Sequence, residues 1–142
     1  MVRTYIDYLR EEIDILRNSG EDFDRSLLHF PDLVQLLCDL LDNELVDKES
    51  RVHANIALGY LVIPNDMVPE EVYGAYGYID DMYVFCIILS NLRVKYYDLI
   101  SSLWDNTEEF DKVLDFCKFS SEKFLEEKNL KEKLLIYCGL SE

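Results

Sequence analysis

The sequence predicts an all-α protein, folded as a single-domain bundle of five to six mostly antiparallel helices. Apolar residues recur at helical spacing through most of the 142 residues, and no useful length of chain alternates apolar and polar residues as a strand does. The predicted connections are short, which favours antiparallel neighbours. We expect the other helices to pack around the longest pattern, a central helix at about 80–104.

The first two helices are predicted from apolar stripes and their end signals. One stripe consists of Val2, Tyr5, Ile6, Leu9, Ile13 and Leu16. The residues Asn18 to Gly20 end this helix, and 20–24 is predicted as a loop. Pro31 and Asp32 suit the first turn of a second helix, where a missing N–H costs nothing and a carboxylate meets the positive end of the helix dipole. The second helix is expected to end near Asn43.

The remaining helices have recognisable starts. Asp47 is a candidate N-cap for a third helix at 48–62, which Pro64 ends. Asn106, followed three residues later by Glu109, resembles a capping box for a fifth helix. That helix would turn one apolar set inward, namely Phe110, Val113, Leu114, Cys117, Phe124 and Leu125. A last short helix leads to Gly139 as a C-terminal cap.

The net charge of −15 restricts the partners of the chain. It repels nucleic acid and anionic membrane surfaces, so direct binding to DNA or RNA is not expected, and a basic partner is favoured. The acidic residues gather in groups, of which 105–111 is one, with Asp105, Glu108, Glu109 and Asp111. Two interpretations stay open, namely solvated helix faces that serve solubility, and a surface complementary to a basic protein.

Cysteine usage and hydropathy indicate a cytoplasmic location. Cys38, Cys86, Cys117 and Cys138 lie far apart among apolar residues, with no CxxC pair, which predicts buried free thiols in a reducing compartment. The first residues lack the apolar core of a signal peptide. The uncharged apolar runs fall well short of the roughly 18 residues that a membrane span needs, so no span is expected.

The stretch 60–85 interrupts the helical order. Its prolines, glycines and aspartates suit turns and helix starts, because proline and glycine favour turn geometry and aspartate bonds to nearby backbone N–H groups. Asp80 and Asp81 fall where the long helix begins, so they are candidate caps. The predicted Pro/Gly/Asp-rich loop covers 64–78, and its structural residues, with the start of the following helix, are Pro64, Asp66, Pro69, Gly77, Asp80 and Asp81.

The segments YLVIPNDMVPE and GYIDDMYVF resemble the YkvA-like domain, a family of unknown function. The resemblance covers about residues 52–92, and Pro64, Asp66, Pro69, Gly77 and the Asp80–Asp81 pair match its pattern. It implies a helical hairpin and carries no established activity. Residues 1–46 and 105–142 lie outside it and are predicted to add helices that pack on the hairpin.

The same stretch holds the candidate functional residues. Asp66, Asp80 and Asp81 supply carboxylate oxygens that suit Mg²⁺ or Ca²⁺, although their spacing fits no EF-hand loop. Capping and loop building are the competing explanation for these aspartates. Tyrosine gives large contact area at low entropic cost, so exposed tyrosines and carboxylates are candidates for contact with a partner. These candidates are Glu70, Glu71, Tyr73, Tyr76 and Tyr78.

The sequence therefore favours a non-catalytic acidic protein that binds another protein, as an adaptor, an inhibitor or an antitoxin-like neutraliser. No arrangement of nucleophile, base and cofactor loop is present, so no catalytic residue and no cofactor is assigned. One alternative is a divalent-metal-binding protein or metal-dependent enzyme that uses the three aspartates. Another is peripheral membrane association, which requires an exposed apolar face on 56–63. Homo-oligomerisation stays open.

Overall fold

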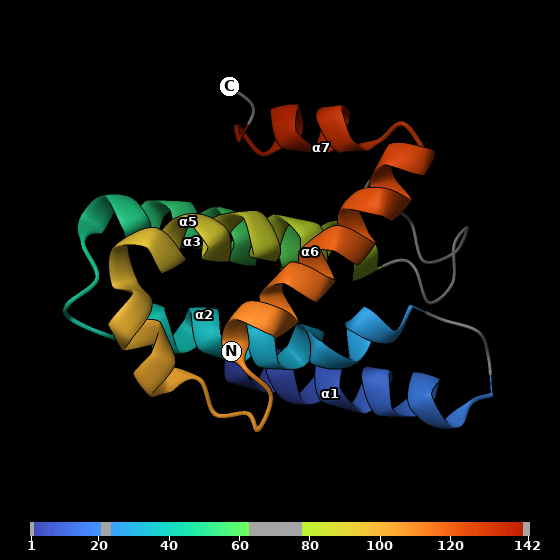
Figure 1. Ribbon diagram of the computed structural model, residues 1–142, viewed down its shortest axis with the longest axis horizontal. Helices are drawn as coiled ribbons and strands as arrows, with labels where there is room; N and C mark the ends of the chain where they lie inside the picture. Colours follow the sequence, from blue (N-terminus) through green and yellow to red (C-terminus); the bar gives the residue numbers. More distant parts are fainter. Residues whose placement is uncertain (1, 21–23, 63–77, 141–142) are drawn as a thin grey trace.

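A computed structural model describes residues 2–20, 24–62 and 78–140, and within these ranges every regular element is a helix. The chain reverses direction from α1 to α2, from α2 to α3 and from α3 to α5, and α6 then crosses obliquely over the others (Figure 1). The predicted all-α bundle is confirmed. Residues 63–77, which include all of the predicted loop 64–78 except its last residue, lie outside the described residues.

The N-terminal layer consists of α1 (Val2–Asn18), a short 3₁₀ helix η1 (Arg25–His29) and α2 (Phe30–Leu41). The 3₁₀ helix η1 was not predicted from the sequence. The Asp24 carboxylate caps this helix by accepting hydrogen bonds from the backbone N–H of Ser26 at 2.9 Å and from its hydroxyl at 2.6 Å. As predicted, Pro31 falls in the first turn of α2. Helix α2 begins at the residue after η1, which places His29 at the junction of the two helices.

Helix α3 (Lys48–Val62) is joined to α2 through the side chain of Arg51. Its guanidinium donates hydrogen bonds to the backbone carbonyls of Leu41, Asn43 and Val46. The carbonyls at the end of a helix have no partners within the helix, and a cation there is also favoured by the helix dipole. Arg51 therefore stabilises the end of α2 and the connection that follows it.

The predicted N-cap, Asp47, links α3 to the central helix. Its carboxylate accepts hydrogen bonds from the Ser50 hydroxyl at 2.6 Å and from the Tyr96 hydroxyl, and it pairs with the Lys95 ammonium at 3.0 Å. The Tyr96 hydroxyl in turn accepts a hydrogen bond from the Asp47 backbone N–H at 2.8 Å. These donors, Ser50 first, hold the pKa of Asp47 well below its usual range.

We expect Asp47→Asn to destabilise the protein at neutral pH, with a smaller effect in acid. A carboxylate whose pKa is lowered by folding stabilises the fold fully above its unfolded pKa of about 3.9, and this stabilisation is lost as pH falls below that value. Urea denaturation of both proteins over a pH series measures the difference. Asp98→Asn, at an exposed position on α5, serves as the control. A wild-type advantage that stays constant into acid would contradict this role for Asp47.

The central helix α5 (Ile79–Leu103) agrees with the predicted 80–104 to within one residue at each end. Its first half is almost wholly buried and contacts α2, α3 and α6. It is kinked at Tyr96, where φ is −123° and ψ is 36°, although the apolar period runs through this position without a break. At this kink the Tyr96 hydroxyl is hydrogen-bonded to Asp47, the residue before α3, so the side chain connects α5 to the start of α3.

Helix α6 (Phe110–Glu127) is followed by the short α7 (Lys131–Tyr137). The predicted capping box before α6 is wrong. Glu109 is the N-cap and makes no side-chain capping bond, whereas Asn106 accepts a hydrogen bond from the Glu108 backbone N–H at 2.9 Å. The Asn106 amide also donates to Asp32 of α2 at 2.9 Å. Asn106 is thus used to build the connection between α5 and α6 and to fasten it to α2.

One apolar core joins the helices. The rings of Phe30 on α2 and Phe85 on α5 meet edge to face at 5.3 Å, and both are fully buried. Within the described part of the chain, no helix has both the length and the apolar character to cross a membrane. The apolar side chains described within 56–61 are buried or half-buried, 62 and 63 lie outside the described side chains, and peripheral membrane association stays a prediction.

Candidate functional site

A buried hydrogen bond connects the end of α3 to the start of α5. The Tyr60 hydroxyl donates to Asp80 Oδ2 at 2.6 Å, and both residues are buried. Asp81, the next residue, is buried as well. Buried carboxylates are costly without such donors, so this bond fixes how the two helices approach each other.

Asp80 and Asp81 occupy the first turn of α5, where carboxylates interact favourably with the helix dipole. Neither is the N-cap, because Tyr78 holds that position and makes no side-chain capping bond. Helix α7 lies beside the Tyr60–Asp80 hydrogen bond. The rings of Tyr60 and Tyr137 meet edge to face at 5.9 Å, and burial, with the Asp80 and Asp81 charges, raises the pKa of Cys138 to about 11.

The other residues proposed from the central stretch are placed as follows. Tyr78 is 7% exposed and its ring packs on Phe30 at 6.5 Å, so little of it is open to a partner. The rest lie outside the described residues, namely Pro64, Asp66, Pro69, Glu70, Glu71, Tyr73, Tyr76 and Gly77. Their roles in loop building and partner contact stay predictions.

The predicted metal site combines Asp80 and Asp81, which the structure describes, with Asp66, which it does not. In the described ranges, no group of three or more His, Cys, Asp or Glu side chains is arranged to hold a metal ion. The third predicted ligand, Asp66, lies outside those ranges. The three-aspartate site for Mg²⁺ or Ca²⁺ therefore stays a prediction.

The four thiols are free, two buried and two half-buried. Burial raises the pKa of Cys86 and raises the pKa of Cys117 to about 12. The thiolate is the nucleophilic form of cysteine, so burial disfavours the reactive form of Cys86 and Cys117. The predicted structural role of these thiols agrees with their surroundings.

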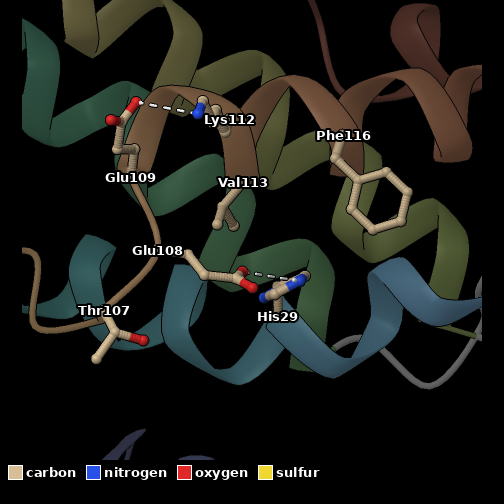
Figure 2. A pocket seen from close by; sticks show the side chains of 7 residues that line it. All are labelled: His29, Thr107, Glu108, Glu109, Lys112, Val113 and Phe116. Carbon is tan, nitrogen blue, oxygen red and sulfur yellow. Dashed lines mark ion pairs between the residues drawn. The ribbon is translucent and has the colours of Figure 1, made fainter.

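A pocket of about 530 Å³ opens between η1, the connection 104–109 and the first turns of α6. We call it the η1–α6 pocket, and it is lined by His29, Thr107, Glu108, Glu109, Lys112, Val113 and Phe116 (Figure 2). The His29 imidazole and the Glu108 carboxylate point toward each other across it, with Nε2 and Oε2 3.5 Å apart. Val113 forms an apolar part of its wall.

Two phenylalanines of α6 extend the surface beside this pocket. Phe116 is 42% exposed and meets the His29 ring edge to face at 6.1 Å. Phe119, one turn further along, is 70% exposed. Positions three apart share a helix face, so the two rings form one apolar strip on the outer side of α6. We call this pair the α6 strip.

Neither this pocket nor the α6 strip was predicted from the sequence. A signal for the strip was present, because the period that turns Val113, Leu114 and Cys117 inward leaves Phe116 at the edge of that face and Phe119 on the opposite face. The acidic group at 105–111 was predicted from the sequence, and two of its members, Glu108 and Glu109, line the pocket. Nothing in the sequence pairs His29 with Glu108, since 79 positions separate them.

Comparison with known proteins places the chain in a family. The family model described as "Protein of unknown function (DUF1232)" matches residues 51–87. An uncharacterized protein, ORF9, of Methanothermobacter thermautotrophicus is 30% identical over 107 residues, which cover 75% of this chain and 73% of that protein. No solved structure is significantly similar.

Two further relatives match over a shorter length. The E3 ubiquitin-protein ligase RNF170 of Xenopus tropicalis is 38% identical over 45 residues, and that of Xenopus laevis is 36% identical over 45 residues. Each match covers 32% of this chain and 18% of the ligase. The family match begins at Arg51, whose guanidinium binds the Leu41 carbonyl at the end of α2. It also includes the hydrogen-bonded pair Tyr60 and Asp80. The resemblance to the YkvA-like domain is thus confirmed, and the chain belongs to the DUF1232 family of proteins of unknown function.

Proposed function

We propose that the chain is a non-catalytic cytoplasmic protein that binds a basic segment of another protein at the η1–α6 pocket and the α6 strip. The observation that carries the proposal is the apolar strip beside a pocket with exposed carboxylates. Phe116 and Phe119 offer apolar contact area to a partner. The side chains of Glu108 and Glu109 are 60% and 73% exposed at the adjacent wall.

The charges select the chemistry of the partner. The two basic side chains that line the pocket each lie near a carboxylate, His29 at 3.5 Å from Glu108 and Lys112 at 3.9 Å from Glu109. The chain as a whole carries −15, so the surrounding field attracts a basic segment and repels an acidic one. A second copy of the same chain would bring the same negative charge, which favours a different protein as the partner.

Such binding suits an adaptor, an inhibitor or an antitoxin-like neutraliser. In each of these roles the protein acts by occupying a surface of its partner, and no covalent step is needed. The free thiols agree with a reducing compartment, which supports the cytoplasmic part of the proposal.

Affinity capture from cells of the native host tests the proposal when wild type and Phe116→Ser/Phe119→Ser are compared. We expect wild type to retain a basic protein at low salt and to lose most of it at high salt. Charge attraction between exposed groups is screened over about 8 Å at physiological ionic strength. The double variant is expected to retain little, because both rings contribute contact area.

Ile15→Ser is the matched control, because Ile15 is 62% exposed on α1, away from the pocket. This variant is expected to capture the partner as wild type does. Equal capture by wild type and the double variant would show that the α6 strip is not the binding surface. Capture that does not fall with salt would contradict a basic partner.

A further inference from the structure

A second hollow, of about 350 Å³, lies on the other side of the connection 104–109. We call it the Trp104 hollow. Its walls include the aromatic residues Tyr97, Trp104 and Phe110, with the acidic residues Glu108, Glu109 and Asp111. Thr107, Glu108 and Glu109 line both this hollow and the η1–α6 pocket, so the two are neighbours. One extended segment of a partner can therefore reach both.

The aromatic residues of the hollow already have partners within the chain. The Trp104 ring meets the Phe110 ring edge to face at 5.3 Å, and its Nε1–H donates a hydrogen bond to the Glu108 carbonyl at 2.8 Å. The Tyr97 hydroxyl donates to Asp111 Oδ2 at 3.1 Å. A ligand that enters the hollow thus loses little affinity to the ordering of its walls.

The charge of the lining is of one sign. Every charged residue that lines the Trp104 hollow is acidic, whereas the neighbouring pocket also contains His29 and Lys112. Arg93 pairs with Asp111 at 3.0 Å, but it is not part of the lining. Aromatic faces attract cations through the ring quadrupole, tryptophan most strongly, and carboxylates attract them by charge.

We propose that the Trp104 hollow receives the cationic side chain, lysine or arginine, of the partner segment. The inference rests on the proposed function, because it names the chemistry by which that partner is recognised. The aliphatic part of the side chain packs on the rings while its charged end meets the carboxylates. A partner segment that lies along the α6 strip and the η1–α6 pocket places one basic residue in this hollow.

The fluorescence of Trp104 tests the inference directly, because it is the only tryptophan in the chain. The probes are N-acetyl-arginine amide and N-acetyl-lysine amide, with N-acetyl-norleucine amide as the uncharged control. We expect a saturable change in Trp104 emission with at least one cationic amide and none with the norleucine amide. Tyr97→Leu and Glu109→Gln are each expected to raise the dissociation constant of the cationic amide by roughly fivefold, which corresponds to the loss of one exposed cation–π or charge contact.

Tyr137→Leu is the matched control, because Tyr137 is a half-exposed tyrosine on α7 that does not line the hollow. It should bind as wild type does. The inference fails if neither cationic amide changes the emission, if the norleucine amide acts equally, or if both lining variants respond as wild type does. It also fails if tetramethylammonium binds and both amides do not, since the hollow would then suit a free quaternary ammonium ion.

This titration needs no partner protein, so its failure and the failure of the capture experiment are distinguishable. If no fluorescence response is seen while capture is intact, only the proposed role of the Trp104 hollow is contradicted. If the fluorescence response is present but no partner is captured, the proposed binding of a partner at the α6 strip is contradicted.

Discussion

Replacing Phe85 with alanine is expected to lower the free energy of unfolding by about 3–5 kcal/mol, the usual cost of truncating a fully buried phenylalanine. Phe85 lies in the first half of α5 and is completely buried. Its ring meets Phe30 of α2 edge to face at 5.3 Å, so the truncation leaves a cavity and removes a contact between two helices. Urea denaturation followed by circular dichroism measures the loss.

Phe119→Ala is the matched control, because the same side chain is removed from a position that is 70% exposed. Surface substitutions usually stay within about 0.5 kcal/mol of wild type. If Phe85→Ala and Phe119→Ala destabilise the protein equally, the packing of α5 on α2 is not the centre of the fold.

Replacing Tyr60 with phenylalanine is expected to lower the free energy of unfolding by about 1.5–3 kcal/mol, as for a hydrogen bond to a charged group. The ring and its contact with Tyr137 remain, and only the donor to Asp80 is removed. The carboxylate then stays buried with one donor fewer, which carries a desolvation cost. Thermal and urea denaturation measure the change.

Tyr97→Phe provides the control for this hydroxyl. The Tyr97 hydroxyl also donates to an aspartate, Asp111 at 3.1 Å, but at an exposed site where water replaces it. We expect the Tyr97→Phe change to be well under that of Tyr60→Phe. Equal effects of the two substitutions would mean that the burial of Asp80 adds nothing to the value of its hydrogen bond.

Apolar periodicity predicted the helices well, because burial against a common core imposes the period. The bounds of α5 and the inward set of α6 follow from it directly. It failed where polar contacts decide the local structure. The 3₁₀ helix η1 has no apolar period of its own and begins at the carboxylate cap Asp24. The kink of α5 lies at Tyr96, whose hydroxyl is hydrogen-bonded to Asp47, a residue distant in sequence.

The candidate site was predictable only in part. An acidic group at 105–111 was recognised as either a solvated face or a docking surface, but its partners in space were not. His29 reaches Glu108 because η1 packs on α6, and Asn106 reaches Asp32 because the connection crosses α2. Such contacts are fixed by the packing of helices that are distant in sequence, and no local spacing encodes them.

Photocrosslinking from the α6 strip tests partner binding at this surface most directly. A benzophenone side chain is placed at position 119, or at position 15 as a control of comparable exposure on α1. In cells of the native host we predict one discrete protein adduct from position 119, lost when Glu108 and Glu109 are both changed to lysine, and no matching adduct from position 15. Absence of an adduct at 119, or the same adducts from both positions, would contradict binding of a basic partner at the η1–α6 pocket and the α6 strip.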